Sequence, residues 1–295
     1  MSGPENNASS HESTAASPRP SRPPHIERPI RYAPAVLVPW KPRIDDPRVL
    51  SKQNGAEVRI FDEGVLLKRG TRVSRNEEAA LRLAKQHTTI PVPRVHHSKY
   101  AMLDGHEYGR IWMDHLEGSP LDRVWGDLDP AVKERLCHEI WSFVEQLRKV
   151  PKPAELEHFY VCGADGSVSR DVLLRDLTNP PSPLLDDESL RSRINERYLY
   201  FNGGSYREHL PDYLPLSDCS VFTHNDIAPR NILVNESHTI TGLIDWEFAG
   251  WYPDYWEYAK TQVQWGQKDW LRWMDRTRPH DWDIVGIHKA KRVLF

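Results

Sequence analysis

One short segment limits the fold more than any other, residues 224–231 with the sequence HNDIAPRN. Asp226 precedes Asn231 by five residues, and a second acid, Asp245, follows a short apolar stretch. The apolar runs 221–223, 232–234 and 239–244 are too short for helices, so we expect short strands around this segment. The fold must then bring a carboxylate, an amide and a second carboxylate together beside one hairpin.

These three groups match what phosphoryl transfer requires of a protein. One carboxylate accepts the proton of the attacking hydroxyl, while an amide oxygen and another carboxylate hold magnesium against the nucleotide phosphates. We therefore predict that Asp226 is the general base and that Asn231 and Asp245 ligate Mg²⁺, which prefers hard oxygen ligands. We expect His224 to hold the loop. The H-x-D-x-x-x-x-N spacing equals that of the protein-kinase catalytic loop.

An ATP site also requires a cation on the phosphates and an anion that positions this cation. Lys68 ends the apolar run Val65-Leu66-Leu67, where a lysine must be paired or reach solvent. Glu77 and Glu78 follow on the next predicted helix, and Glu77 fits the helix phase better. The alternative is a strand-edge lysine in solvent, but the downstream motif favours the nucleotide role.

The order of elements predicts an α+β chain with two lobes, a small antiparallel sheet followed by a mainly helical part. We expect order from Asn54 onward, and helix 76–85 with Ser74 as its N-cap. The expected strands are 57–61, 65–69, 94–100 and 108–116, with a turn at 62–64. The later expected helices are 130–150, 187–200, 253–264 and 267–274. Residues 151–185 are proline-rich and irregular, with a short hairpin near 163–166.

The first part of the chain differs in composition, because it holds many prolines and little periodic apolar pattern. We predict a mostly disordered tail over 1–50, since such a segment cannot bury enough surface to offset its ordering entropy. Its arginines are either solvated or a dock for an acidic partner. The predicted lobes are 51–117, which binds the nucleotide, and 118–295, which carries catalysis and the acceptor site.

Charge and composition exclude several classes of function. The formal net charge is −3, so no strong basic field indicates a nucleic-acid partner. No apolar run is long enough to span a membrane, and the N-terminus lacks the pattern of a secretory signal. Three cysteines are too few and too scattered for a disulfide framework, so we expect a cytoplasmic protein. The oligomeric state is left open.

Beyond these residues, the chain resembles the fungal branch of the aminoglycoside phosphotransferase and choline kinase family over roughly 55–275. Residues 224–231, 243–247 and 249–257 carry the resemblance, together with 88–93 and 113–118. It implies a bilobal protein-kinase-like fold that transfers the ATP γ-phosphate to a small-molecule hydroxyl. It also implies that the segment from Met113 through His115 to Leu116 is the hinge that meets the adenine.

The chain departs from the family pattern at three places. No G-x-G-x-x-G precedes Lys68, Asn225 and Ala228 replace the usual loop residues, and the chain ends at Phe295 where relatives usually carry further helices. A nucleotide-binding pseudokinase or scaffold without turnover is therefore the main alternative, and the last departure predicts a shortened acceptor pocket. A protein kinase is less favoured, because no long activation segment follows Asp245.

Aromatic residues beside Asp254 and Glu257 allow two interpretations. Trp251, Tyr252, Tyr255 and Trp256 either pack the following helix against the core or, with the two acids, enclose a cationic amine. Packing is favoured, and the same holds for Trp265, Trp270, Trp273 and Trp282. The predicted acceptor is thus a small hydroxylated molecule, with a cationic one as the special case.

Overall fold

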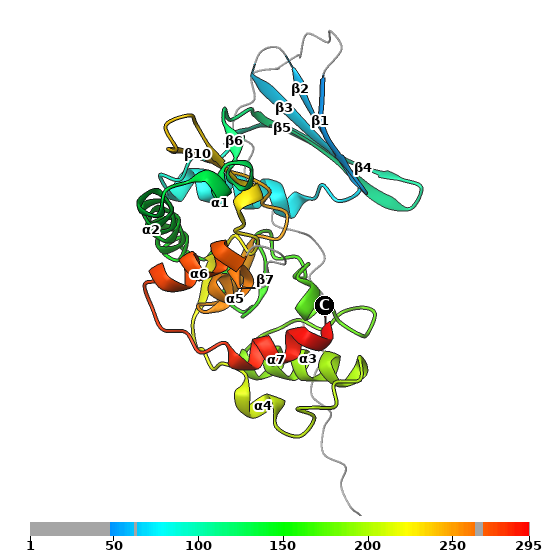
Figure 1. The fold of residues 1–295 in the computed structure, drawn as a ribbon. Coiled ribbons are helices and arrows are strands. Elements are labelled where there is room, and N and C mark those ends of the chain that lie inside the picture. Colours follow the sequence, from blue (N-terminus) through cyan, green and yellow to red (C-terminus); the bar gives the residue numbers. More distant parts are fainter. Residues whose placement is uncertain (1–47, 62–63, 263–267, 295) are drawn as a thin grey trace, which may run out of the picture.

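The computed structural model describes residues 48–61, 64–262 and 268–294, which form two lobes (Figure 1). The first lobe contains β1 (Arg48–Gln53), β2 (Ala56–Phe61), β3 (Val65–Gly70), α1 (Arg75–His87), β4 (Val95–Leu103) and β5 (His106–Asp114). Most of the predicted tail, the turn residues Asp62 and Glu63, and residues 263–267 of the last two predicted helices lie outside the described part.

The first lobe is one antiparallel sheet in the order β1-β2-β3-β5-β4. β3 is central, so its main chain is bonded on both sides, and Lys68 lies opposite Val58 of β2 and Ile111 of β5. Alternation along the strand places Lys68 on the same face as Leu66. The direction of this lysine is therefore fixed by two neighbouring strands.

Helix α1 packs beside this sheet through small side chains. Ala79, Ala80 and Ala84 are buried, which lets the helix approach closely. Ser74 has the extended backbone of an N-cap, but its side chain makes no cap hydrogen bond and instead accepts one from Arg170 at 3.2 Å. The predicted position of the cap is confirmed, whereas its expected hydrogen bond is not.

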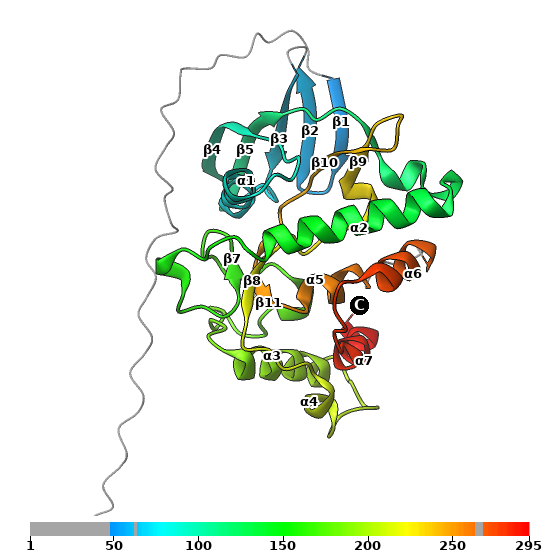
Figure 2. The ribbon, with the colours of Figure 1, turned by 90° about the vertical axis from the view of Figure 1, so that its left-hand side faces the viewer.

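The second lobe is mainly helical (Figure 2). Its α-helices are α2 (Pro130–Leu147), α3 (Asp187–Tyr200), α4 (Leu210–Tyr213), α5 (Trp256–Thr261), α6 (Lys268–Thr277) and α7 (Val285–Leu294). Its short helical turns are η1 (Leu121–Arg123), η2 (Trp125–Asp127), η3 (Ala154–Leu156), η4 (Val172–Leu174) and η5 (Pro229–Asn231). Its strands are β6 (Ser119–Pro120), β7 (Cys162–Gly163), β8 (Ser220–Thr223), β9 (Ile232–Val234), β10 (Ile240–Leu243) and β11 (Gly250–Pro253).

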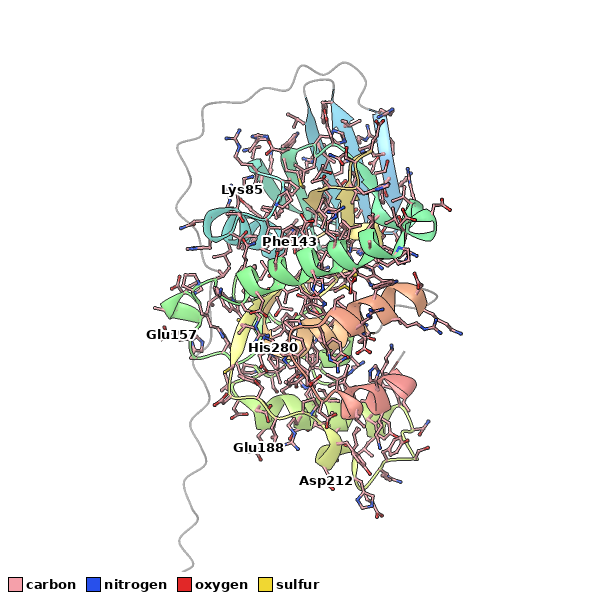
Figure 3. The ribbon with its side chains drawn as sticks, turned by 60° about the vertical axis from the view of Figure 1, so that its left-hand side comes forward. Lys85, Phe143, Glu157, Glu188, Asp212 and His280 are labelled. Atoms are coloured by element: carbon pink, nitrogen blue, oxygen red, sulfur yellow. The ribbon has the colours of Figure 1, made fainter. Side chains whose placement is uncertain are left out.

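Helix α2 runs between the sheet lobe and the rest of the second lobe. Its inner face includes Leu136, Ile140 and Val144, which are buried at helical spacing and belong to the helix predicted over 130–150. Figure 3 shows side chains, Phe143 of α2 among them, filling the layer between the lobes. Within the described residues, no helix combines the length and apolarity that a membrane span requires.

Two small antiparallel sheets present residues 224–231. β9 pairs with β10 and β6, and β8 pairs with β11, which also pairs with β7. The expected short strands are confirmed, and β9 and β10 form the expected hairpin, but the segment 224–231 connects β8 of one sheet to β9 of another, which the short apolar runs do not predict. Gly163 and Gly166 form the predicted tight turn, with Gly166 N–H donating to Gly163 O at 3.0 Å.

The sequence does not predict strand β1, because order is expected only from Asn54. Along Arg48–Gln53 only Ser51 is partly buried, so the segment has no apolar alternation to detect. Its main chain pairs with β2 from Gln53↔Ala56 to Arg48↔Ile60. Backbone pairing at a sheet edge leaves no mark in the side-chain pattern.

The predicted helix 253–264 is shorter than expected. Its first expected residue, Pro253, is the last residue of β11 (Gly250–Pro253), and α5 begins only at Trp256. A Cβ on Gly250 would lie 2.4 Å from Cys162 O, so this strand approaches β7 where only glycine fits. Pairing of β11 with β7 and β8 therefore keeps Pro253 in the strand, and the helix starts later than expected.

Helices α4 and α7 are also absent from the prediction. α7 buries Ile287 and Ala290, and it packs closely on α4 through Gly286. A Cβ on Gly286 would lie 2.2 Å from Tyr213 O. The glycine hides this helix in the sequence, because glycine disfavours helix interiors by about 1 kcal/mol.

We expect Gly286→Ala to lower the free energy of unfolding by about 1–3 kcal/mol, because the added methyl overpacks the contact between α7 and α4. Urea unfolding measures this change. Gly126→Ala is the matched control, since a Cβ there meets no atom within 4 Å. Because alanine favours a free helix, stabilisation by Gly286→Ala would contradict the packing of α7 on α4.

Candidate active site

Lys68 of β3 lies between two carboxylates that come from different lobes. Its Nζ is 2.6 Å from Glu77 Oε1 on α1 and 2.7 Å from Asp245 Oδ1, which follows β10. Lys68 and Glu77 are buried, whereas the Asp245 side chain is 31% exposed. The structure therefore brings together the predicted phosphate-binding cation, its partner and one predicted metal ligand.

The two carboxylates stabilise the charge of Lys68. Burial alone would lower the pKa of Lys68, but Glu77 and Asp245 outweigh it and raise that pKa above its ordinary value. Burial alone would raise the pKa of Asp245, but the positive groups around it, Lys68 first, together outweigh burial, so this carboxyl titrates below its usual range. Burial dominates at Glu77, whose pKa is raised. A charged lysine beside an ionised aspartate is what a phosphate and metal site needs.

The structure also decides between the two candidate partners of Lys68. Glu78 pairs with Arg82 at 2.9 Å and accepts a hydrogen bond from Tyr100 Oη at 3.0 Å. Successive helical residues point about 100° apart, so only one of the two glutamates faces β3. Glu77 faces it, as the helix phase predicts.

Asp226 lies at the start of the loop that connects β8 to β9, and its side chain is clamped. Both of its carboxylate oxygens accept hydrogen bonds from Arg230 Nη2, at 2.6 and 2.7 Å. Asn231 Nδ2 donates to Asp226 Oδ2 at 2.8 Å and to its main-chain oxygen at 2.9 Å. The contact between Arg230 and Asp226 is not among the predictions from the sequence.

His224 holds this loop from within the core. Its Nδ1 accepts from the Asp226 N–H at 3.2 Å, so its Nε2 carries the proton and donates to Ile244 O at 3.1 Å. Burial lowers the pKa of His224, so the ring is neutral. The ring also meets Trp246 edge-on, with centroids 4.6 Å apart. These contacts agree with the predicted holding role.

Two residues of the site adopt left-handed backbone conformations. Asn225 has φ +66° and Asp245 has φ +67°, a region that asparagine and aspartate tolerate better than other side chains. Such conformations persist where the surroundings fix them, and they cluster at functional sites. One of the two, Asp245, reaches Lys68 of the first lobe from this conformation.

Glu257 of α5 supports the loop, a role that the sequence analysis misses. Its buried carboxylate accepts the His224 N–H at 2.7 Å and the Asn225 N–H at 3.1 Å. Burial raises its pKa to about 7, although the loop N–H groups oppose this. One signal was available, because Glu257 is an acid flanked by the aromatic residues Trp256 and Tyr258.

The remaining donors fit Mg²⁺ better than a protein-only metal cage. Asn231 uses its amide nitrogen on Asp226, which leaves the amide oxygen as the group that can face a cation. Asp245 supplies a carboxylate. No group of three or more His, Cys, Asp or Glu positioned to hold a metal occurs among the described residues. Magnesium usually takes one or two carboxylates, with waters and substrate phosphates completing its shell.

Two main-chain N–H groups of the predicted hinge are already hydrogen-bonded within the first lobe. Met113 lies in β5 opposite Leu66, and the His115 N–H donates to Gly64 O at 2.8 Å. The Asp114 N–H likewise donates to Arg94 O. An adenine would therefore have to meet other atoms of the segment 113–117 than these two N–H groups.

The aromatic cluster packs in the core. Trp251, Tyr252, Tyr255 and Trp256 are each at most 2% exposed, which confirms the packing interpretation. Glu257 is occupied by the loop above. Trp270 is buried and Trp273 and Trp282 are partly buried against the same core, while Trp265 lies outside the described residues.

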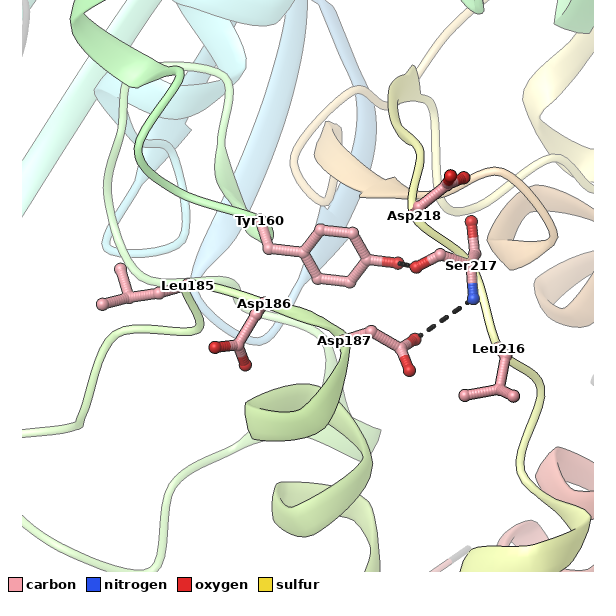
Figure 4. A pocket seen from close by; sticks show the side chains of 7 residues that line it. All are labelled: Tyr160, Leu185, Asp186, Asp187, Leu216, Ser217 and Asp218. Carbon is pink, nitrogen blue, oxygen red and sulfur yellow. Dashed lines mark hydrogen bonds between the residues drawn. The ribbon is translucent and has the colours of Figure 1, made fainter.

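A surface hollow of about 720 Å³ lies elsewhere on the second lobe (Figure 4). Tyr160, Asp186, Asp187, Ser217 and Asp218 are among its lining residues. Tyr160 Oη donates to Ser217 O, and the Ser217 N–H donates to Asp187. None of the predicted site residues lines it, so we place the chemistry at the junction of the lobes.

Solved structures with a similar fold include aminoglycoside phosphotransferases. A complex of APH(2")-IIa with streptomycin and ATP aligns with a TM-score of 0.54 at 13% identity, over 85% of this chain and 81% of that chain. The GDP complex of aminoglycoside 2'-phosphotransferase-IIIa gives 0.54 at 17% identity, over 84% and 81%. At such identities the likeness shows the α+β, bilobal, kinase-like fold, as the sequence predicts.

Sequence comparison gives the family. No curated protein sequence matches the chain at a significant level. The model of the phosphotransferase enzyme family matches residues 57–281, which include both lobes and every predicted site residue. The chain therefore belongs to the phosphotransferase enzyme family.

Proposed function

We propose that the protein transfers the γ-phosphate of Mg·ATP to a hydroxyl group of a small molecule. The observation that carries this proposal is the contact of Lys68 with both Glu77 and Asp245, beside the loop that holds Asp226 and Asn231. These residues come from β3, α1, the segment after β10 and the loop after β8. A chance polar turn would not gather them.

Each residue then has one task. Lys68 binds phosphate oxygens, and Glu77 keeps its ammonium group in place. Asn231 and Asp245 would hold Mg²⁺, which supplies charge neutralisation when bound. Asp226 accepts the proton of the acceptor hydroxyl while the hydroxyl oxygen bonds to the γ-phosphorus of ATP. The bond between this phosphorus and the oxygen of the leaving ADP breaks. The segment from Met113 through His115 to Leu116 contacts the adenine.

Structures of aminoglycoside phosphotransferases support a small acceptor, because one contains streptomycin with ATP and another contains kanamycin with GDP. Residues 246–249 alone separate Asp245 from β11, which leaves no room for the activation segment of a protein kinase. With the aromatics buried, a cationic acceptor has no cage, and we place no charge requirement on it. We also propose that the protein belongs to the fungal branch of the aminoglycoside phosphotransferase and choline kinase family. We further propose that it is cytoplasmic.

One observation favours a second function, a nucleotide-binding scaffold without turnover. Arg230 occupies both oxygens of Asp226, and a base held in this way must release or share these contacts when an acceptor enters. Because Arg230 is 45% exposed at its side chain, it has room to move. Turnover by the wild-type protein decides between the two functions.

We expect Asp226→Ala to reduce turnover by about 10²–10⁴-fold, the usual contribution of a general base, and to leave nucleotide binding intact. ADP release with a panel of hydroxylated amines, sugars and aminoglycosides measures turnover, and thermal shift with Mg·ATP measures binding. Asp212→Ala is the control, because Asp212 is an exposed acid on α4. Equal turnover in Asp226→Ala and wild type would refute the role of Asp226.

The raised pKa of Glu257 predicts how the free energy of unfolding depends on pH. Its pKa is raised from 4.5 to about 7 in the folded protein, so folding takes up a proton between these values and stability falls as pH rises through this window. The loss is on the order of 3 kcal/mol, since one pKa unit corresponds to about 1.4 kcal/mol.

Glu257→Gln should remove this part of the pH dependence, because glutamine does not titrate. Urea unfolding at pH 5 to 7.5 should therefore show a shallower decline in this variant than in wild type. Glu236→Gln, at an exposed turn position, should keep the wild-type slope. Identical slopes in wild type and Glu257→Gln would show that Glu257 does not titrate in this range.

A further inference from the structure

Asn76, the neighbour of Glu77, joins three segments of the chain. Its Nδ2 donates to Ala249 O at 2.9 Å and to Glu247 O at 3.2 Å, both just after Asp245. Its Oδ1 accepts from the Ala164 N–H at 2.6 Å, in the turn after β7. Asn76 is 3% exposed, so these bonds are shielded from water. The amide thus fixes the first turn of α1 to the second lobe.

Two arginines also join the connection between β3 and α1 to the second lobe, and one of them, Arg72, is part of this connection. Arg72 forms an ion pair with Glu247, whose side chain is buried. Arg170 Nη1 donates to Arg72 O at 2.8 Å and to Ser74 Oγ at 3.2 Å. We call Arg72, Asn76, Arg170 and Glu247 the lobe latch.

The lobe latch lies directly beside the residues that hold Lys68. Asn76 precedes Glu77 in the first turn of α1, and Glu247 follows Asp245 by two residues. Adjacent residues of a helix move as one body, so fixing Asn76 also fixes Glu77. The same bonds hold the main chain just after Asp245. One junction therefore positions both carboxylates of the Lys68 contact.

In protein kinases, the corresponding ion pair and metal-binding aspartate are set in place by the activation segment and by movement of the helix. In this protein, the main-chain oxygens of Glu247 and Ala249, just after Asp245, accept hydrogen bonds directly from Asn76 of α1. Residues 246–249 lead straight into β11, which is paired on both sides by β8 and β7. Residues 246–249 are therefore too short a connection to move away from α1.

We propose that the lobe latch is a positioning device that keeps Lys68, Glu77 and Asp245 assembled without nucleotide, modification or partner. This inference rests on the proposed function, because it assigns the assembled site to phosphate binding. The latch residues do not touch the substrate, and they act through Glu77 and Asp245. The protein would then meet its nucleotide with a preformed phosphate site.

The test compares two ligands of the full-length protein by calorimetry. AMP-PNP with Mg²⁺ requires Lys68 and Asp245, whereas adenosine requires only the hinge. We expect Asn76→Ala to weaken binding of AMP-PNP with Mg²⁺ at least 10-fold and to leave adenosine binding within twofold. Gln146→Ala is the matched control, because Gln146 joins α2 to Thr89 away from the latch and should change neither.

Hydrogen exchange without ligand tests the preformed state directly. Amides of residues 71–80 should exchange slowly in the wild-type protein and at least 10-fold faster in Asn76→Ala, while β1 and β2 remain unchanged. Arg170→Ala, which removes a half-buried contact, should give the same pattern if Asn76→Ala does not fold.

The outcomes separate the two proposals. Equal weakening of both ligands, weakening of neither, or fast exchange of 71–80 in the wild-type protein would overturn the latch. Failure of the wild-type protein to bind AMP-PNP with Mg²⁺ would instead overturn the proposed function.

Discussion

The contact of Lys68 with Glu77 and Asp245 is the interaction on which the rest of the site depends. A buried ion pair is costly to desolvate, and removing one partner from such a pair costs about 3–5 kcal/mol. The fold therefore has to hold all three charges in place. β3 fixes Lys68 through two neighbouring strands, α1 fixes Glu77, and the short segment before β11 fixes Asp245. Each lobe thus contributes one carboxylate to the same ammonium group.

The catalytic side is held by a second buried charge. Glu257 lies beneath residues 224–231 and accepts main-chain N–H groups, so it orients the loop without touching the predicted substrate. His224 bridges from this loop to Ile244, one residue before Asp245. The predicted base and one predicted metal ligand are thus coupled through the core. Arg230 adds a third contact that an entering acceptor must displace or share.

Local patterns predicted the elements whose side chains carry a periodic signal. Helices α2 and α3, strands β2 and β3, and the hairpin of β9 and β10 all have apolar residues at the expected spacing, and the structure confirms them. The elements that were missed lack this signal for identifiable reasons. β1 is an exposed edge strand, β11 is a strand through pairing with β7 and β8, and α7 contains Gly286 at a close contact.

By itself, the sequence determined the order of the two lobes, the candidate residues for phosphate and metal chemistry, and the absence of a long activation segment after Asp245. These features follow from residue type and spacing, which are local properties. Tertiary structure alone decided that Glu257 supports the loop, that Arg230 clamps Asp226 and that Asn76 joins α1 to the second lobe. Glu257 and Asn76 are ordinary polar residues in the sequence, and their partners lie on other elements. Their roles appear only when folding brings charges and hydrogen-bonding groups together in a place that water does not reach.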